Sequence, residues 1–173
     1  MIVGDGDIAK VLKESGIDTD GIIYFASGVS NSKCQGQNGE FNREISRLLK
    51  HDPKYHIVYF SSLALHYNDS TPYAKHKRRM ESIINRVFKT YTIFRIGNIT
   101  WGNNPNTIIN HFKNQMANLQ DLEIQEGNRY LLTQEELLAA CKKIDINNRK
   151  TIILSGRMVK ISDIVEEIIQ GKL

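Results

Sequence analysis

Cysteine and proline are both scarce in this chain of 173 residues, which contains two cysteines and three prolines. Cys34 and Cys141 lie far apart in the sequence, so we expect neither a disulfide framework nor a metal site. No apolar run approaches the length of a membrane-spanning helix. Met1 leads directly into a predicted strand rather than into a basic signal sequence. We therefore expect a cytoplasmic protein with no membrane partner.

A large excess of charge of one sign is also missing, because the net charge is only +4. The densest basic cluster, Lys75 to Arg79, could attract the phosphates of a nucleotide or of a nucleic acid. The chain has no interleaved aromatic and basic residues and no known nucleic-acid motif, so we expect no nucleic-acid partner. Its length suits a single domain, which we predict over residues 1–173.

A predicted strand followed by serine, tyrosine and lysine is the most informative stretch of the sequence. The apolar run Ile57–Phe60 predicts a buried strand, and Ser61 and Ser62 stand where that strand should end. Tyr73 and Lys77 have the i, i+4 spacing, so a helix would place the phenol and the ammonium on one face. A cation beside a phenol lowers a pKa that is normally about 10. A nearby serine hydroxyl could hold a carbonyl or carbinol oxygen within reach of that phenol.

Each of these residues also has an ordinary explanation. A tyrosine at the start of a helix usually packs against its neighbours, and a lysine in the run KHKRR usually lies on a solvated face. The strand, the serine pair, the loop and the Tyr-x-x-x-Lys spacing are rarer together in this order. The order therefore favours a catalytic site.

The first residues carry a G-x-G-x-x-A pattern, GDGDIA, between a short predicted strand and a predicted helix. This is the context that the dinucleotide-binding fingerprint requires. Gly4 would allow the tight turn, Gly6 would let the backbone approach a pyrophosphate, and Ala9 would allow close packing of helix and strand. A plain turn fits the same residues, and Asp5 and Asp7 would repel a pyrophosphate if they pointed toward it.

The second strand of a standard dinucleotide-binding unit is missing from the pattern. That strand ends in an acidic residue about 20 residues after the glycines and holds the adenosine ribose. Here only Ile17–Asp20 precedes the next predicted strand, Gly21–Ala26. The adenosine side is therefore expected to be deleted or rebuilt. The polar segment Ser27–Ser32 then follows a strand, where ligands bind in α/β sheets, although an ordinary loop is equally compatible with its composition.

Strand and helix patterns alternate along the rest of the chain, which predicts a mainly parallel α/β sheet. Thr133 and Glu136 form a predicted capping box, and Ser162 is a predicted cap of the last helix. Asn98 follows a strand and could hydrogen-bond a ligand at the sheet edge. The predicted helices are Glu40–Lys50, Lys75–Lys89, Thr107–Leu119, a helix from Thr133 to about Lys143 and a terminal helix. The other predicted strands are Tyr91–Ile96, Leu122–Gln125, Arg129–Leu132 and Lys150–Leu154.

Taken in order, these segments resemble a shortened member of the short-chain dehydrogenase/reductase superfamily. The resemblance is closest to the extended branch, which includes NAD-dependent epimerases, dehydratases and reductases of nucleotide sugars. It implies a Rossmann-like fold with helices on both faces of the sheet, without the usual second and third strands. About 103–173 would form a reduced substrate-side region. The segments that carry the resemblance are GDGDIA, IIYFAS, IVYFSS with YAKHK, RIGNITWG and ILSGRMVKISDIVEEI.

The resemblance also implies roles for individual residues. Tyr73 would be the catalytic acid/base, Lys77 would lower its pKa and hold the nicotinamide ribose, and Ser62 would be the catalytic serine. Ser62 and Asn98 would contact the substrate, and hydride would pass between a sugar carbon and NAD or NADP. The implied cofactor-binding residues are Gly4, Gly6, Asp7, Ile8, Ala26, Ser27, Gly28, Lys77, Ile96 and Asn98.

Two functions of different class remain open. The first is an oxidoreductase, epimerase or dehydratase that acts on a nucleotide sugar or a related hydroxyl or carbonyl compound. The second is a non-catalytic nucleotide-binding or regulatory relative, in which Tyr73→Phe would leave function intact. In either case we expect a homodimer formed through the helices Glu40–Lys50 and Lys75–Lys89, whose apolar faces motivate this prediction.

Overall fold

A parallel sheet forms the main body of the molecule. The computed structural model describes residues 1–31, 33–37, 39–67, 70–122 and 124–173. All neighbouring strands of this sheet are parallel, which confirms the predicted mainly parallel α/β class. In spatial order the strands are β1 (Ile2–Val3), β2 (Ile22–Phe25), β3 (His56–Ser62), β4 (Tyr91–Ile96) and β7 (Arg149–Leu154).

The short strand β1 forms one edge of this sheet. The chain leaves β1 through helix α1 (Asp7–Glu14) and returns as β2, which pairs directly with β1 so that Ile2 faces Tyr24. Within the described residues no strand lies beyond β1 in this sheet. This order is what the absence of the second and third strands of the usual unit predicts.

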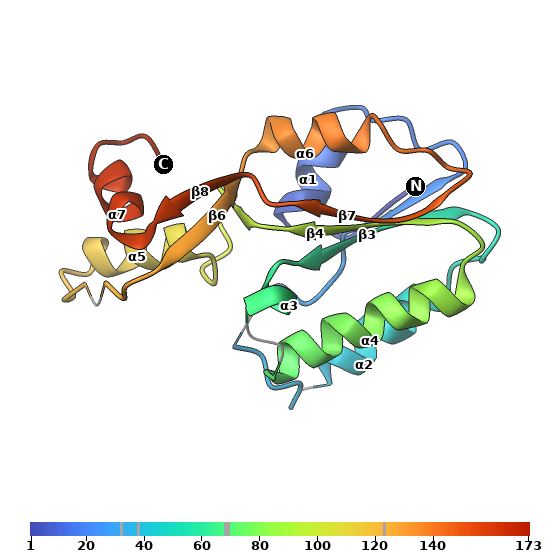
Figure 1. Ribbon diagram of the computed structural model, residues 1–173, viewed down its shortest axis with the longest axis horizontal. Coiled ribbons are helices and arrows are strands. Elements are labelled where there is room, and N and C mark those ends of the chain that lie inside the picture. Colours follow the sequence, from blue (N-terminus) through green and yellow to red (C-terminus); the bar gives the residue numbers. More distant parts are fainter. Residues whose placement is uncertain (32, 38, 68–69, 123) are drawn as a thin grey trace.

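Helices cover both faces of the sheet (Figure 1). Helices α1 and α6 (Gln134–Cys141) lie on one face, and α2 (Glu40–Leu48) and α4 (Pro72–Val87) lie on the other. The middle of strand β3 is apolar because it is buried on both faces: Val58 and Phe60 pack in the cluster with Leu12 and Leu137, while Ile57 and Tyr59 pack under α2 and α4.

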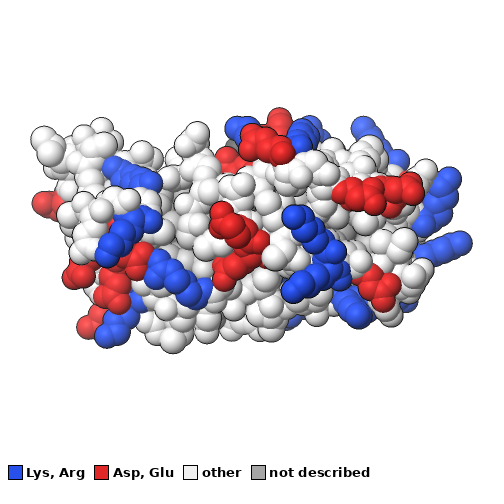
Figure 2. All heavy atoms as spheres, turned by 90° about the horizontal axis from the view of Figure 1, so that it is seen from above, with Lys and Arg blue, Asp and Glu red and all other residues white. Residues whose placement is uncertain are grey.

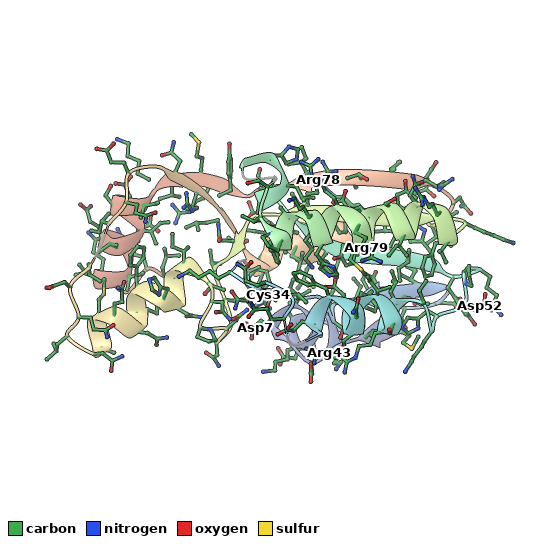
Figure 3. All side chains as sticks on the ribbon, turned by 90° about the horizontal axis from the view of Figure 1, so that it is seen from below. Asp7, Cys34, Arg43, Asp52, Arg78 and Arg79 are labelled. Atoms are coloured by element: carbon green, nitrogen blue, oxygen red, sulfur yellow. The ribbon has the colours of Figure 1, made fainter. Side chains whose placement is uncertain are left out.

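The apolar sides of α2 and α4 belong to this core. Leu48, Met80 and Ile84 pack with the sheet residues Ile57 and Tyr59. Most of the apolar residues that motivated the expected dimer are therefore covered by the sheet, while Leu49 is exposed, and the dimer itself stays a prediction. Their outer faces carry charged residues, among them Arg43, Arg78 and Arg79 (Figure 3).

A smaller sheet lies beside the main one (Figure 1). It contains β5 (Asn98–Ile99), β6 (Asn128–Leu132) and β8 (Arg157–Lys160), of which β6 pairs in parallel with β5 and antiparallel with β8. Helices α5 (Ile108–Ala117) and α7 (Ile161–Ile169) pack against it through a cluster that includes Phe112, Leu131 and Ile164.

Some local predictions are wrong. The residues of Leu122–Gln125 that the structure describes are not in a strand, and Glu123 lies outside the described residues. Ser162 does not cap α7, which starts after Lys160; its hydroxyl donates to the neighbouring Asp163. The prediction also missed β5, β8 and the short helix α3 (Ala64–Tyr67). The capping box of Thr133 and Glu136 is confirmed.

Helix α4 begins three residues earlier than the predicted start at Lys75. The Thr71 side chain accepts a hydrogen bond from the Ala74 N–H, and Pro72 occupies the first helical turn, where its missing N–H costs nothing. This early start places Tyr73 and Lys77 in the same helix.

On the face of the molecule that carries α1 and α6, charges of both signs are mixed (Figure 2). None of the described helices is both long and apolar enough to cross a membrane.

Candidate active site

A cavity of about 860 Å³ opens at the carboxyl ends of the main strands. Ala26 follows β2, Ser62 ends β3 and Ile96 ends β4, and all three line it. The opposite wall comes from the smaller sheet, through Asn128 and Tyr130. Parallel sheets bind ligands at this edge, and the volume falls in the range of small-molecule sites, about 300–1,000 Å³.

Most of the predicted site residues meet in this cavity. The two exceptions are Gly4 and Ser27. Gly4 has a φ of 123°, and a Cβ there would overlap the Ala26 carbonyl, so this glycine serves the close approach of β1 and β2. The Ser27 hydroxyl accepts from Arg47 at 2.6 Å and lines a smaller adjoining cavity of about 380 Å³. The predicted residues that line the larger cavity are Gly6, Asp7, Ile8, Ala26, Gly28, Ser62, Tyr73, Lys77, Ile96 and Asn98.

The structure distinguishes the two serines at the end of β3. Ser61 is buried and donates to Glu81 at 2.7 Å, so its hydrogen is already in use. The Ser62 oxygen accepts from the Ala64 N–H at 3.1 Å. A hydroxyl that accepts in this way can still donate its own hydrogen. Ser62 is therefore the better placed of the two to bind a substrate oxygen.

Tyr73 and Lys77 lie on the buried side of α4, as their spacing predicts. The Lys77 ammonium is 5.7 Å from the centre of the Tyr73 ring. Lys77 is only 2% exposed, which is rare for a lysine and requires partners in the interior. A solvated position for this lysine, which the charged run KHKRR would suggest, is therefore excluded.

The partners of Lys77 form what we call the Glu44 cluster: Glu44, Tyr59, His76, Lys77 and the Val29 N–H. One carboxylate oxygen of Glu44 accepts from the Tyr59 hydroxyl at 2.7 Å and from the Lys77 ammonium at 3.3 Å. The other accepts from the Val29 N–H at 2.8 Å and lies 2.8 Å from His76 Nε2. Lys77 also donates to the Tyr59 hydroxyl oxygen at 2.9 Å.

The electrostatics of the cluster favour an ionised Glu44. Burial by itself would raise the pKa of this carboxyl, but the Lys77 charge and the hydrogen bonds from His76, Val29 and Tyr59 lower it to about 2. Burial, with the Glu44 charge in addition, raises the pKa of Tyr59 well above its ordinary value. Tyr59 is therefore a neutral donor, and Glu44 and Lys77 form a buried ion pair.

The sequence reasoning missed Glu44, although a signal was present. Glu44 lies three residues after Phe41 and four before Leu48, which places all three on one face of α2. Leu48 is fully buried, and the Phe41 ring stacks on His76 at 4.2 Å. A glutamate on the apolar face of a helix indicates a buried charge with a specific partner.

The Asp7 carboxylate contacts the loop that contains Gly102 and Asn104. Its Oδ2 accepts from the Asn104 N–H at 3.2 Å, and a Cβ on Gly102 would overlap it. Asp7 lies where the main sheet with its helices meets the smaller sheet with its helices (Figure 3). The N-cap of α1, Gly6, makes no side-chain cap, and a Cβ there would have nothing within 4 Å. The first turn of α1 thus retains room and N–H donors for an anion.

The cavity wall opposite the main sheet is rich in asparagine, which the sequence reasoning noticed only at Asn98. The Asn98 side-chain amide donates to the Tyr130 carbonyl at 3.2 Å and so ties β5 to β6. Arg129 brings a positive charge to the same wall. The described residues contain no group of histidine, cysteine and carboxylate side chains that could hold a metal ion. The lining residues that were missed include Asn103, Asn104, Asn106, Thr107, Asn128, Arg129 and Tyr130.

The fold matches three solved structures, of which two are UDP-sugar 4-epimerases and one is an enzyme bound to NAD+. The enzyme WbmH of Bordetella bronchiseptica, in complex with NAD+, is 14% identical, with a TM-score of 0.72 over 95% of this chain and 62% of that chain. UDP-glucuronic acid 4-epimerase of Bacillus cereus, in complex with UDP-glucuronic acid and NAD, is 15% identical, with a TM-score of 0.66 over 98% and 64%. UDP-N-acetylglucosamine 4-epimerase of Methanobrevibacter ruminantium is 17% identical, with a TM-score of 0.65 over 96% and 63%.

Identities this low establish the fold and leave the activity open. No protein-family model and no curated protein sequence matches this chain. The chain spans less than two thirds of the length of the three solved structures. It therefore has the Rossmann-like α/β fold of NAD-dependent epimerases and dehydratases, with only part of their length.

Proposed function

We propose that this chain binds NAD or NADP together with a nucleotide sugar or a related substrate, and that it catalyses hydride transfer in an epimerase, dehydratase or reductase reaction. The observation that carries the proposal is the shared cavity, in which Ser62, Tyr73 and Lys77 line one wall and the first turn of α1 lines another. These residues are in three separate elements, and the fold brings them to one sheet edge.

The residues present fit a dinucleotide over part of its length. Gly6 leaves space at the start of α1 for a pyrophosphate. The smaller cavity shares Gly6, Ala26 and Gly28 with the larger one and offers room on the adenosine side. When bound, the nicotinamide would supply the hydride donor or acceptor. This supports a cofactor site in which the missing second strand is replaced by the edge of β1 and by α2.

The protein's own contribution would be to hold and move a proton. Ser62 would bind the reacting substrate oxygen, and Tyr73 would take the hydroxyl proton on oxidation and return it on reduction. The Lys77 charge, close to the Tyr73 ring, would favour the ionised phenol during that transfer. Tyr73 is only 6% exposed and lines the cavity.

The substrate wall supports a nucleotide sugar. Arg129 offers a positive charge to a diphosphate, and the asparagines Asn98 and Asn128 offer both donors and acceptors to hydroxyl groups. The Bacillus cereus structure, whose ligands are UDP-glucuronic acid and NAD, makes a UDP-sugar a reasonable first substrate to test.

The non-catalytic alternative rests on two observations. The chain covers less than two thirds of its structural neighbours, and the Lys77 ammonium is held by Glu44 and Tyr59 inside the protein. In a nucleotide-binding or regulatory relative, these residues would stabilise the scaffold without turnover.

We also propose a single domain over residues 1–173, and we keep the prediction of a homodimer through α2 and α4. Because the outer faces of these helices are charged, such an interface would be largely polar. A monomer mass in light scattering would contradict the dimer.

Turnover separates the two functions. Purified protein should be incubated with NAD+ and UDP-glucuronic acid or UDP-glucose, and the sugar should be followed by proton nuclear magnetic resonance. We expect new anomeric signals with the wild type and a loss of at least about a hundredfold in rate with Tyr73→Phe. The non-catalytic relative would be favoured if the wild type binds a dinucleotide but turns over none of the tested sugars, and if Tyr73→Phe binds the dinucleotide equally well.

A further inference from the structure

Glu44 is an ionised carboxylate in the protein interior that takes no direct part in the chemistry proposed above. It is 2% exposed, and its two oxygens have four partners from three other parts of the chain: the Val29 N–H, Tyr59 of β3, and His76 and Lys77 of α4. A buried charge is costly unless each of its hydrogen-bonding positions is satisfied. The partners of Glu44 meet that condition.

The Lys77 ammonium depends on this carboxylate. An ammonium has three hydrogens to donate. Within the described residues the Lys77 ammonium donates to the Tyr59 hydroxyl oxygen and to Glu44. Only Glu44 carries a negative charge. Among the described residues no third acceptor of this ammonium is seen, and Lys77 lines the cavity.

The same carboxylate also ties the cavity loop to the ammonium. The Val29 N–H donates to Glu44, and a Cβ on Gly28 would lie 2.9 Å from both the Lys77 nitrogen and a Glu44 oxygen. Gly28 and Val29 both line the cavity. The backbone at Gly28 therefore covers the ion pair closely and fixes how far the ammonium can extend.

We propose that Glu44 is the positioning residue of this site, and that its carboxylate keeps the Lys77 ammonium charged and fixed beneath Gly28 with one hydrogen available to a ligand in the cavity. The inference rests on the proposed function only in naming that ligand as a dinucleotide. The positioning itself depends on the Glu44 cluster alone.

The variant Glu44→Gln keeps the shape of the side chain and removes its charge. The matched control is Glu81→Gln. Glu81 also binds a serine hydroxyl and a cation, Ser61 and Arg95, but its ion pair is partly exposed. Both variants should be compared with the wild type by the same measurements.

The first measurement needs no cofactor. Nuclear magnetic resonance of the Lys77 ε-methylene group reports the charge of the ammonium. We expect this signal to titrate between about pH 6 and 9 in Glu44→Gln, because a buried ammonium without a counter-charge releases its proton readily. In Glu81→Gln we expect the signal to follow that of the wild type over this range. A signal in Glu44→Gln that does not titrate would overturn the inference.

The second measurement is the affinity for the dinucleotide, by calorimetric titration. We expect Glu44→Gln to bind roughly tenfold more weakly than the wild type at pH 9, about the effect of one lost charge-assisted hydrogen bond. The affinity should recover toward pH 6, where the ammonium regains its proton. A loss that is the same at both pH values would indicate a purely structural role and overturn the inference. If the wild type binds no dinucleotide while Lys77 titrates in Glu44→Gln, the proposed function fails and the positioning role stands.

A third measurement applies if Glu44→Gln is too unstable for these experiments. The folded state would then carry an unpaired Lys77 that prefers to be neutral, so its stability should rise with pH. The urea midpoint of Glu44→Gln should increase from pH 6 to 9 relative to that of Glu81→Gln. An unchanged or falling difference would overturn the inference.

Discussion

Two carboxylates contact side chains of β3 and have similar sets of partners. Glu44 binds a tyrosine hydroxyl and a lysine, and Glu81 binds the Ser61 hydroxyl and an arginine, Arg95. The side chains of the first ion pair are 2% and 1% exposed, and those of the second are 27% and 12% exposed. The Glu44–Lys77 pair is buried, so each charge depends on its protein partner. The Glu81–Arg95 pair is partly exposed, so water can partly solvate either charge.

The position of the two pairs gives that difference a functional meaning. Lys77 lines the cavity, and its ammonium pairs with Glu44 inside the protein. Arg95 pairs with Glu81, whose remaining contact is with Ser61, the serine that does not offer its hydrogen to the cavity. We infer that the Glu81 pair supports the end of β3 and that the Glu44 pair prepares the site.

The largest difference is expected when each carboxylate is neutralised. Glu44→Gln should lose roughly 3 kcal/mol of unfolding free energy because it leaves a buried lysine without a counter-charge. Glu81→Gln should lose about 1 kcal/mol, as expected for a partly exposed pair. Urea unfolding at pH 7 measures both losses. Equal losses would remove the distinction between the two regions.

Removing the lysine should change how stability depends on pH. In the wild type the pKa of Glu44 is lowered from 4.5 to about 2, so its contribution is present above pH 4.5 and is lost as the pH falls toward 2. Lys77→Met removes the main charge that opposes the effect of burial, so the pKa of Glu44 should rise. Carboxyl carbon resonances and urea midpoints between about pH 2 and 6 test this, and an unmoved Glu44 titration would argue against the ion pair.

The two serines should separate activity from stability. Ser62→Ala should reduce turnover by about a hundredfold with little change in urea midpoint. Ser61→Ala should lose about 1 kcal/mol of stability, because one hydrogen bond to Glu81 is removed, and should keep most of the turnover. The opposite pattern would assign the catalytic role to Ser61.

The close packing over Lys77 predicts an effect at Gly28. A Cβ there would lie 2.9 Å from the Lys77 nitrogen, closer than a normal contact. Gly28→Ala should therefore lose roughly 1–2 kcal/mol. Gly6→Ala is the matched control, because a Cβ at Gly6 would have nothing within 4 Å, and its urea midpoint should stay within error of the wild type. Similar midpoints for the two variants would contradict the close cover over Lys77.

The sequence predicted the main sheet because its signals are local. Strands buried on both faces read as continuous apolar runs, as in Ile57–Phe60, and the Tyr73 and Lys77 spacing fixes a shared helix face. The strands β5 and β8 are too short to show the alternation of apolar and polar residues that identifies a strand. Leu122–Gln125 has an apolar alternation and was predicted as a strand, but a strand also requires a partner that the pattern does not reveal.

The part of the site that comes from a single segment of the sequence could be predicted. Ser62, Tyr73 and Lys77 come from one stretch, and the structure places them in one cavity. The Glu44 cluster joins the loop after β2 with α2, β3 and α4, so its contacts depend on tertiary packing. The same is true of Arg129, whose segment lies on a different sheet.

Calorimetric titration of the purified protein with NAD, NADH, NADP and NADPH tests the central claim most directly. Gly6→Asp is the control: its added carboxylate would enter open space at the start of α1 and repel a pyrophosphate without disturbing the fold. We expect micromolar binding of at least one dinucleotide to the wild type and none to Gly6→Asp. Binding of none of the four to the wild type would contradict the oxidoreductase assignment.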